Sequence, residues 1–228
     1  MSALPSCMPI PAAATWVLAG GRSTRMGRDK ALLPFGGRPL IEVAVEKLEK
    51  LRELGLGQPR IAGSRPDLSG FAAVVDDVHP GCGPLSGIEA ALTATCEPLN
   101  LFLPIDMPLV PAAFLSWILL RAEVTGAIAT LPRAGGAVQP LCAVYHRDLL
   151  TQVTRSLLAG DYKVTRVLEL AFGEDAGMQR VDAFDIELLV TTYPALAGES
   201  VIPAHRWFEN CNSPQDLEAV EAFARARK

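Results

Sequence analysis

The sequence predicts an α/β fold of the Rossmann-like, doubly wound type, with a mostly parallel central sheet. Apolar runs without polar alternation recur along the chain, and most of them are followed by a helix-like segment. Such runs are typical of strands that are buried on both faces and joined through helices. Half of the 228 residues are hydrophobic, 50% by count, which is ample for a large core. Right-handed crossovers then produce the doubly wound arrangement.

Strands and helices are expected to alternate through most of the chain. Strands are predicted at Ala12–Ala19, Arg60–Gly63, Phe71–Asp76, Asn100–Ile105, Gly126–Leu131 and Pro140–Tyr145. Helices are predicted at Arg38–Leu54, Pro84–Thr95, Pro111–Arg121, His146–Leu158, Lys163–Ala171 and Ser213–Arg227. In the last of these, Ser213 is the expected N-cap and Pro214 the first helical residue.

The length of the chain favours a single domain over residues 1–228, because two full domains need more residues. Residues 173–205 are harder to interpret, since short apolar segments lie there among Gly, Pro and acidic residues. We expect an insertion or a lid in this stretch.

Charge and composition exclude several classes of function. The formal net charge is −4, so the chain has no general attraction for nucleic acid or for an anionic membrane. The five cysteines are scattered without a CxxC pair, which favours reduced thiols over a zinc site. No apolar stretch approaches the roughly 18–20 residues needed to span a bilayer. A cytoplasmic protein is therefore expected.

The segment Thr15–Arg38 concentrates positive charge in a glycine-rich turn. It holds five basic residues against one acid, Asp29; the basic residues are Arg22, Arg25, Arg28, Lys30 and Arg38. Gly20 and Gly21 follow the first predicted strand, at the edge where open α/β sheets bind ligands. Glycines let backbone N–H groups approach an anion, and Arg25 and Lys30 add full charges. The spacing fits neither GxxxxGK[ST] nor GxGxxG, but the composition predicts a polyphosphate ligand.

The order of residues in this turn, LAGGxSxRMGxxKALLPxxG, resembles the signature of the molybdenum cofactor guanylyltransferase (MobA) family. That family has a nucleotide-diphospho-sugar transferase-like fold. Four further segments resemble the family's motifs in the same order along the chain: VVDDVHPGCGPLSGIEAAL, LFLPIDMPLVP, QPLCAVYH and FENCNSPQDLEA.

The resemblance implies roles for residues around the turn. Leu18, Ala19 and Gly20, with Gly21 beside them, would contact the guanine base and ribose, while Lys30 and Arg25 would bind the triphosphate. Asp106 ends an apolar strand and matches the family's metal ligand. A carboxylate there suits Mg²⁺, which binds one or two carboxylates together with phosphate oxygens. Asp106 also fits the role of a helix N-cap, and the two roles are compatible.

Three further sites follow from the same motifs. The family carries one acid before its GPL segment; we favour Asp77 over Asp76 because the loop after it then aligns without a gap. Gly83 opens a helix whose N-terminus could face an anion, or it simply starts that helix. Asn210 and Asn212 match the closing motif near the metal and the pterin, and they also suit a turn before a helix.

The resemblance implies transfer of GMP from GTP to the phosphate of molybdopterin or the molybdenum cofactor, with release of pyrophosphate and Mg²⁺ as cofactor. Cofactor-delivery or recipient proteins are expected partners, and nucleic acid and membranes are not. Two alternatives stay open. One is cytidylyl transfer or sugar-nucleotide pyrophosphorylase chemistry on another phosphorylated acceptor, and the other is a non-catalytic nucleotide-binding module.

Overall fold

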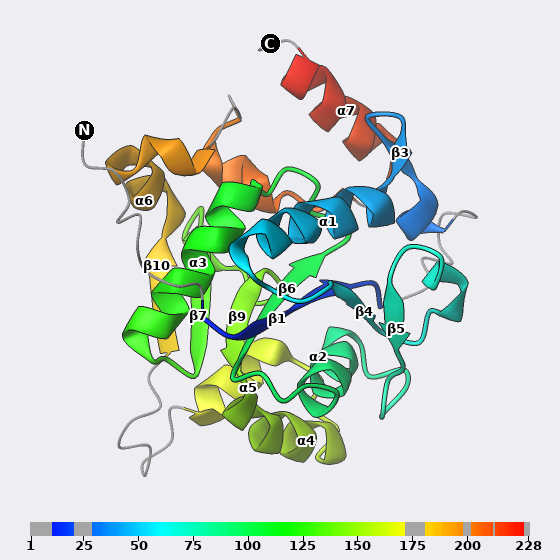
Figure 1. Cartoon of the computed structure of the whole chain (residues 1–228), viewed down its shortest axis with the longest axis vertical. Helices are drawn as coiled ribbons and strands as arrows, with labels where there is room; N and C mark the ends of the chain where they lie inside the picture. Colours follow the sequence, from blue (N-terminus) through cyan, green and yellow to red (C-terminus); the bar gives the residue numbers. More distant parts are fainter. Residues whose placement is uncertain (1–10, 21–28, 172–180, 198–201, 212, 226–228) are drawn as a thin grey trace.

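The computed structural model describes residues 11–20, 29–171, 181–197, 202–211 and 213–225. Its centre is a mostly parallel sheet that has eight strands among these residues, in the order β10-β7-β9-β6-β1-β4-β5, with β8 paired to β7 (Figure 1). The strands are β1 (Ala13–Leu18), β4 (Arg60–Ala62), β5 (Ala73–Val75), β6 (Leu99–Pro104), β7 (Ala129–Ala134), β8 (Ala137–Val138), β9 (Ala143–His146) and β10 (Val181–Asp185).

Helices cover both faces of the sheet, as the predicted fold class requires. On one face, apolar side chains of the sheet form a core with α1 (Leu40–Glu49), α3 (Ala112–Thr125) and α6 (Ile186–Thr192). On the other face they pack against α2 (Pro84–Thr93), α4 (Leu150–Leu158) and α5 (Val164–Ala171). The predicted α/β class with a mostly parallel, helix-covered sheet is confirmed.

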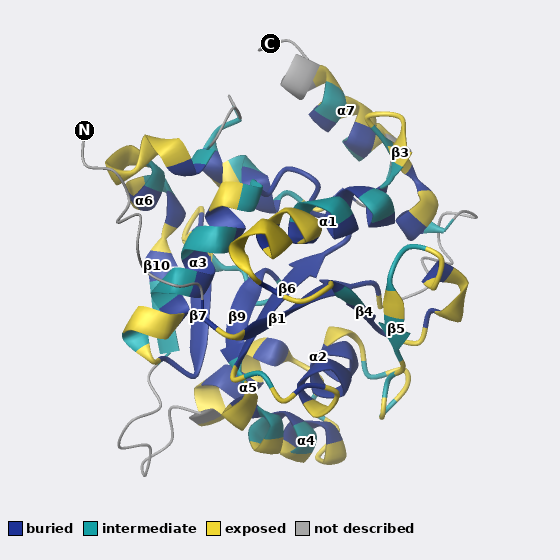
Figure 2. Ribbon diagram, viewed as in Figure 1, coloured by how far each residue is buried: buried dark blue, intermediate teal, exposed yellow. Residues whose placement is uncertain are grey.

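The two central strands explain why continuous apolar runs fit this fold. Every residue of β1 and of β6 is buried (Figure 2). Successive side chains point to opposite faces of a strand, so Val17 belongs to one core and Trp16 to the other. The indole of Trp16 donates to Asn100 Oδ1 at 3.0 Å, and Asn100 Nδ2 donates to the Glu97 carbonyl at 3.3 Å, so the polar side-chain groups of both buried residues have partners.

Several boundaries differ from those predicted. The expected helix Arg38–Leu54 begins only at Leu40, because residues 34–39 form a small antiparallel hairpin of β2 (Pro34–Phe35) and β3 (Arg38–Pro39). Its last turn, Lys50–Leu54, is a 3-10 helix. The strand β9 runs antiparallel to both β6 and β7, so the sheet is mixed at this point.

The described part of residues 173–205 is built into the sheet and its core. β10 pairs in parallel with β7 at the edge of the sheet, and α6 follows it directly. Phe184, Ile186 and Leu189 are buried in the main core. Arg121 on α3 joins Asp182 on β10 through two hydrogen bonds of 2.5 and 2.8 Å. The sequence analysis expected an insertion or a lid at residues 173–205 and did not predict the strand β10 within it.

The C-terminal helix α7 (Pro214–Arg225) packs beside the β2–β3 hairpin. Ser213 and Asp216 bond reciprocally: the Asp216 N–H donates to Ser213 Oγ at 3.1 Å, and the Ser213 N–H donates to Asp216 Oδ2 at 2.8 Å. This is a capping box, and it confirms Ser213 as the N-cap. Leu217 and Val220 bury the inner face of α7 against Leu33 and Leu40.

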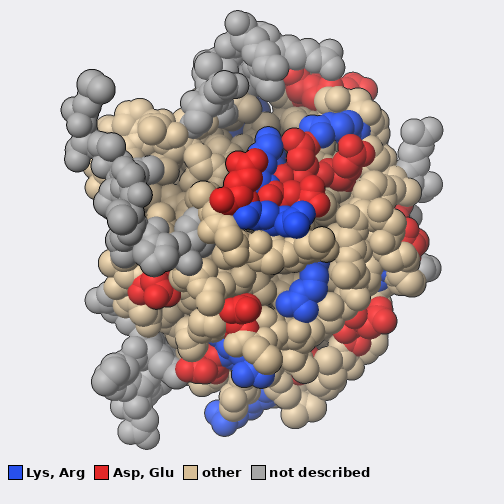
Figure 3. Space-filling view, in the orientation of Figure 1, with Lys and Arg blue, Asp and Glu red and all other residues tan. Residues whose placement is uncertain are grey.

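The surface over α1 carries interleaved charges of both signs (Figure 3). Glu46 pairs there with Arg38 and, at 3.3 Å, with Lys50. This face therefore presents no broad field of one sign. Within the described residues, no helix combines the length and the apolar character needed to cross a membrane.

Candidate active site

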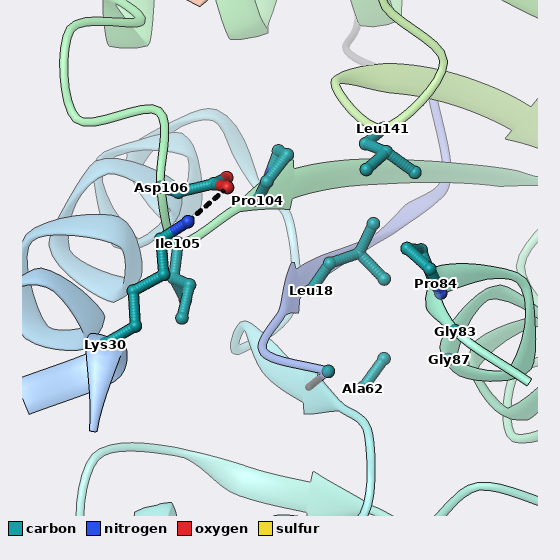
Figure 4. Close-up of a pocket in the computed structure, with 11 residues that line it drawn as sticks. Leu18, Lys30, Ala62, Gly83, Pro84, Gly87, Pro104, Ile105, Asp106 and Leu141 are labelled. Carbon is teal, nitrogen blue, oxygen red and sulfur yellow. Dashed lines mark hydrogen bonds and ion pairs between the residues drawn. The ribbon is translucent and has the colours of Figure 1, made fainter. Parts of the chain in front are cut away.

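A pocket with a cavity volume of about 210 Å³ lies where β1, β4 and β6 end and α2 begins (Figure 4). Neighbouring parallel strands end at the same edge of the sheet, which is where open α/β folds bind ligands. The pocket is lined by Leu18, Gly20, Lys30, Ala62, Gly83, Pro84, Gly87, Pro104, Ile105, Asp106 and Leu141.

Lys30 and Asp106 form an ion pair at one side of this pocket, and 76 residues separate them in the sequence. The Lys30 Nζ lies 2.7 Å from Asp106 Oδ2, and the two side chains are 11% and 22% exposed. A charge-assisted hydrogen bond of this length in a partly buried place fixes both side chains. The structure thus brings together a cation and a carboxylate that the sequence analysis selected separately.

The backbone around Lys30 is set by the residue before it. Asp29 is the N-cap of a 3-10 turn, Lys30–Leu32, and its Oδ1 accepts a hydrogen bond from the Ala31 N–H at 3.0 Å. Short polar side chains at this position satisfy N–H groups that the turn leaves open. Lys30 is therefore held at the first residue of a defined turn.

Asp106 is held through its main chain by two distant segments. The Ile105 N–H donates to the Leu18 carbonyl at 3.2 Å, and the Cys211 N–H donates to the Asp106 carbonyl at 2.9 Å. The second bond brings the closing motif beside the predicted metal ligand. Asn210 precedes Cys211 and is exposed, and it is not among the residues that line the pocket. Burial raises the pKa of the Cys211 thiol to about 11.

Leu18, Gly20 and Gly83 all line the pocket, and Gly83 lies on the side away from Lys30 (Figure 4). Ala19 does not: it is buried, and its N–H donates to the Ala62 carbonyl at 3.3 Å. Gly83 is the N-cap of α2 with φ of 69°, a left-handed conformation that favours glycine. Pro84 then occupies the first turn, so the N-terminus of α2 meets the pocket.

The adjacent acids Asp76 and Asp77 differ in their surroundings. Asp76 is exposed, whereas Asp77 is half-buried, and its N–H donates to Ser64 Oγ at 3.0 Å. Burial raises the pKa of Asp77, and its buried Oδ1 has no hydrogen-bond partner among the described residues. Neither acid lines the pocket itself. The partly buried carboxylate of Asp77 is the better candidate for a ligand contact.

His79 has a partner that the sequence analysis did not find. Its Nδ1 lies 2.6 Å from Oε2 of Glu89, a buried residue of α2. Glu89 Oε1 accepts a hydrogen bond from Thr154 Oγ1 at 2.7 Å. These contacts tie the loop before α2 to the helix and to α4. His79 lies in the loop before α2 and Glu89 lies within that helix, so no helical or strand spacing in the sequence indicates that the two residues are in contact.

Gly21, Arg25 and Asn212 lie outside the described residues, so their assignments stay predictions. Several pocket residues were missed by the sequence analysis: Ala62, Gly87, Pro104, Ile105 and Leu141. Ala62 ends β4, next to β1, so the strand-end argument applied to Gly20 could have found it. Leu141 reaches the same edge because β9, which begins just after it, is antiparallel.

The described residues contain no group of three or more His, Cys, Asp and Glu side chains placed to hold a metal ion. A cation at Asp106 would need most of its oxygen ligands from a bound phosphate and from water. This donor set fits Mg²⁺, which binds through few carboxylates and through substrate phosphates.

Comparison with known proteins identifies the family. The MobA-like NTP transferase domain family matches residues 15–179. The chain belongs to this family. It is 32% identical over 200 residues to a molybdenum cofactor guanylyltransferase from Xanthomonas euvesicatoria, covering 87% of this chain and 89% of that one. It is 31% identical to a probable molybdenum cofactor guanylyltransferase from Chloroflexus aggregans, covering 91% and 92%.

A solved structure agrees with this MobA-like assignment. The crystal structure of molybdopterin-guanine dinucleotide biosynthesis protein A from Archaeoglobus fulgidus matches with a TM-score of 0.72 and 25% identity. The match covers 93% of this chain and 99% of that chain. The chain is therefore a MobA-like nucleotidyltransferase in fold and in family.

Proposed function

We propose that this protein transfers GMP from GTP to the phosphate of molybdopterin, or of its molybdenum-loaded form. The observation that carries the proposal is the Lys30–Asp106 pair of 2.7 Å, at the sheet edge of a chain whose relatives are named guanylyltransferases. A cation and a carboxylate at one end of a pocket suit a triphosphate and a divalent cation. The sheet is continuous from β5 to β10, so we treat residues 1–228 as one nucleotidyltransferase domain.

The proposed reaction is an in-line displacement. An oxygen of the acceptor phosphate attacks the α-phosphorus of GTP and forms a new P–O bond. The bond from that phosphorus to the oxygen bridging to the β-phosphate breaks, and pyrophosphate leaves with the electron pair. A phosphate monoester has its second pKa at about 6, so the acceptor is already largely dianionic near neutral pH. No nucleophilic side chain and no general base is required.

The residues of the pocket would supply positioning and charge. Leu18 and Gly20, with Ala19 and Gly21, are proposed to hold the base and ribose opposite Gly83. Lys30 and Arg25 are proposed to bind the triphosphate and to stabilise the departing pyrophosphate. Positioning and electrostatic stabilisation account for most catalysis of phosphoryl transfer.

Asp106 is the proposed Mg²⁺ ligand. When bound, Mg²⁺ would neutralise charge on the phosphate oxygens. Asp77 is proposed to contact the nucleotide from the end of β5, and Asn210 and Asn212 to lie near the metal and the pterin. Delivery or recipient proteins in the cytoplasm would exchange the cofactor with the enzyme.

The test is a thermal-shift panel followed by a turnover assay. GTP, CTP, UTP and ATP are each added with and without Mg²⁺, because a ligand that binds the folded state raises the melting temperature. We expect the largest shift with GTP and Mg²⁺, and release of pyrophosphate once molybdopterin is added. A response to CTP instead would assign cytidylyl transfer, and binding without turnover would indicate a non-catalytic module.

A further inference from the structure

A tight turn after β4, Gly63–Ser64–Arg65, contacts both Gly20 and Asp29, the two residues that bound the part of the glycine-rich turn with most of its basic residues. Gly63 lies against Gly20, where the segment begins: a Cβ on Gly63 would stand 3.3 Å from the Gly20 nitrogen. The φ of Gly63 is 126°, which is a glycine conformation. Arg65 reaches Asp29, the last residue before Lys30. One short turn therefore contacts the residues on both sides of residues 21–28.

Arg65 is an unusually buried cation, with 3% of its surface exposed. Its Nη2 donates to the carboxylates of both Asp29 and Asp67, and the distance to Asp67 Oδ2 is 2.7 Å. Its Nε lies 3.0 Å from Asp67 Oδ1. The two carboxylates raise the pKa of Arg65. A buried charge is tolerated only when it is paired in this way, so the arrangement is costly to break.

Asp29 connects this buried cation to the ion pair of the site. One of its oxygens accepts from Arg65, and the other caps the Ala31 N–H at 3.0 Å. The capped turn begins with Lys30, whose Nζ lies 2.7 Å from Asp106. Arg65 thus bonds to Asp29, and Asp29 caps the turn whose first residue is Lys30.

We propose that Arg65 is a positioning residue for the reaction. By holding Asp29, it fixes the start of the Lys30 turn and keeps the Lys30 ammonium group at the phosphate end of the pocket. The inference rests on the proposed role of Lys30 in binding the departing pyrophosphate. It assigns a function to a residue that touches neither the pocket nor, in the proposed reaction, the reacting atoms.

Two variants separate this role from a general loss of stability. Asp29→Asn keeps an oxygen that can cap Ala31 but removes the charge that Arg65 binds. Arg65→Met removes the guanidinium group and leaves an unbranched apolar side chain in place of the arginine stem. The matched control is Arg121→Met, which removes another partly buried arginine with a two-bond carboxylate partner, Asp182, at the far edge of the sheet.

Two measurements are made on each protein. The first is the dissociation constant of inorganic pyrophosphate, determined by calorimetry in the presence of Mg²⁺. The second is kcat and KM for GTP in the pyrophosphate-release assay. We expect Asp29→Asn and Arg65→Met to weaken pyrophosphate binding and to lower kcat by up to about 100-fold, the effect of misplacing a catalytic group by about 1 Å. KM for GTP should change far less, since the base and ribose contacts stay. Arg121→Met should match the wild type in both measurements.

The outcomes distinguish this inference from the proposed function. Wild-type pyrophosphate affinity or wild-type kcat in Asp29→Asn would overturn the inference, even if Arg65→Met fails to fold. Equal losses in Arg65→Met and Arg121→Met would also overturn it. If the wild type binds pyrophosphate but transfers no GMP, the proposed function fails and the pyrophosphate affinities alone decide the inference. If the wild type does not bind pyrophosphate, the inference fails.

Discussion

Lys47 on α1 donates a hydrogen bond from its ammonium group to the carbonyl of Pro108, two residues beyond Asp106. The group lies near the Cys142 thiol, and the charged residues beside it are Glu46 on the same helix and Lys50 just after the end of that helix. Burial lowers the pKa of Lys47 to about 7, and burial also raises the pKa of Cys142 to about 12. A buried amine thus supports the turn that carries the proposed metal ligand.

This arrangement predicts a pH-dependent stability. The folded pKa of about 7 lies below the ordinary value of 10.5, so above pH 7 the unfolded chain binds more protons at Lys47 than the folded chain. The free energy of unfolding should then rise with pH from about 7 upward, by at most about 1.4 kcal/mol per pH unit from this residue. Urea unfolding of the wild type and of Lys47→Met at about pH 7, 7.5 and 8 isolates the effect, because exposed cysteines ionise mainly above this range, with a pKa of about 8.5. Parallel curves for the two proteins would contradict the prediction.

Lys30→Ala should abolish most turnover and leave the protein folded. Loss of one positioned group that stabilises developing charge typically costs about 10²–10³ in kcat. The measurement is pyrophosphate release under saturating GTP, with far-UV circular dichroism to verify folding. Lys50→Ala is the control, because Lys50 is an exposed lysine in a surface ion pair with Glu46. Wild-type turnover in Lys30→Ala would mean that another cation binds the triphosphate.

Asp106→Asn should remove the activation of turnover by Mg²⁺, rather than only lower the affinity of the enzyme for the metal. The amide is nearly the same size as the carboxylate, and the backbone bond from the Cys211 N–H to the Asp106 carbonyl is unaffected. A titration of activity against Mg²⁺ should show residual turnover that does not rise to the wild-type level at any metal concentration. A curve merely shifted to higher metal, with full activity at its end, would assign the main ligand elsewhere.

Asp77→Asn should lower kcat/KM for GTP, whereas Asp76→Asn should leave it unchanged, because only Asp77 is partly buried. The Asp77→Asn substitution should also raise the melting temperature at neutral pH. Burial raises the pKa of Asp77, so the folded state disfavours its charged form, and stability is lost as pH rises through that pKa. Melting curves at pH 4 and pH 7 should show the gain only at pH 7. The idea fails if Asp76→Asn is the more damaging variant in the turnover assay.

Much of the fold could be predicted because the two central strands, β1 and β6, are recognisable from their own residues. β1 and β6 are buried on both faces, so they are apolar throughout and cannot be mistaken for exposed strands. β10 was missed because it reads Val-Asp-Ala-Phe-Asp: it is an edge strand, and Asp182 is neutralised by Arg121 on a distant helix. No local pattern records such a partner.

The same difference explains which residues of the candidate site could be predicted: those in recognisable motifs were found, and those buried through distant partners were not. Asp106 was found because it ends an apolar strand, and Lys30 because it belongs to the glycine-rich turn whose signature the chain shares. The pairing of β1 with β6 places the end of β6 beside the start of that turn, but the contact between the two side chains is seen only in the structure. Arg65 and Glu89 were not found. Each is a charged residue that looks like a solvated surface group in the sequence. In the structure each is buried and has a partner far along the chain, Asp29 for Arg65 and Thr154 for Glu89. Only the assembled structure shows that their charges are compensated.

The position of β1 in the sheet has a consequence for how the molecule is made. β1 pairs on one side with β4 and on the other with β6, where Ala13 lies opposite Leu99. The middle of the sheet therefore forms only after the ribosome has delivered nearly half of the polypeptide, and Leu141 reaches the binding edge later still. Such long-range pairing slows folding. An emerging chain would expose the apolar side chains of its first strand for that time, so we expect its folding yield to rise when chaperones that bind nascent chains are present.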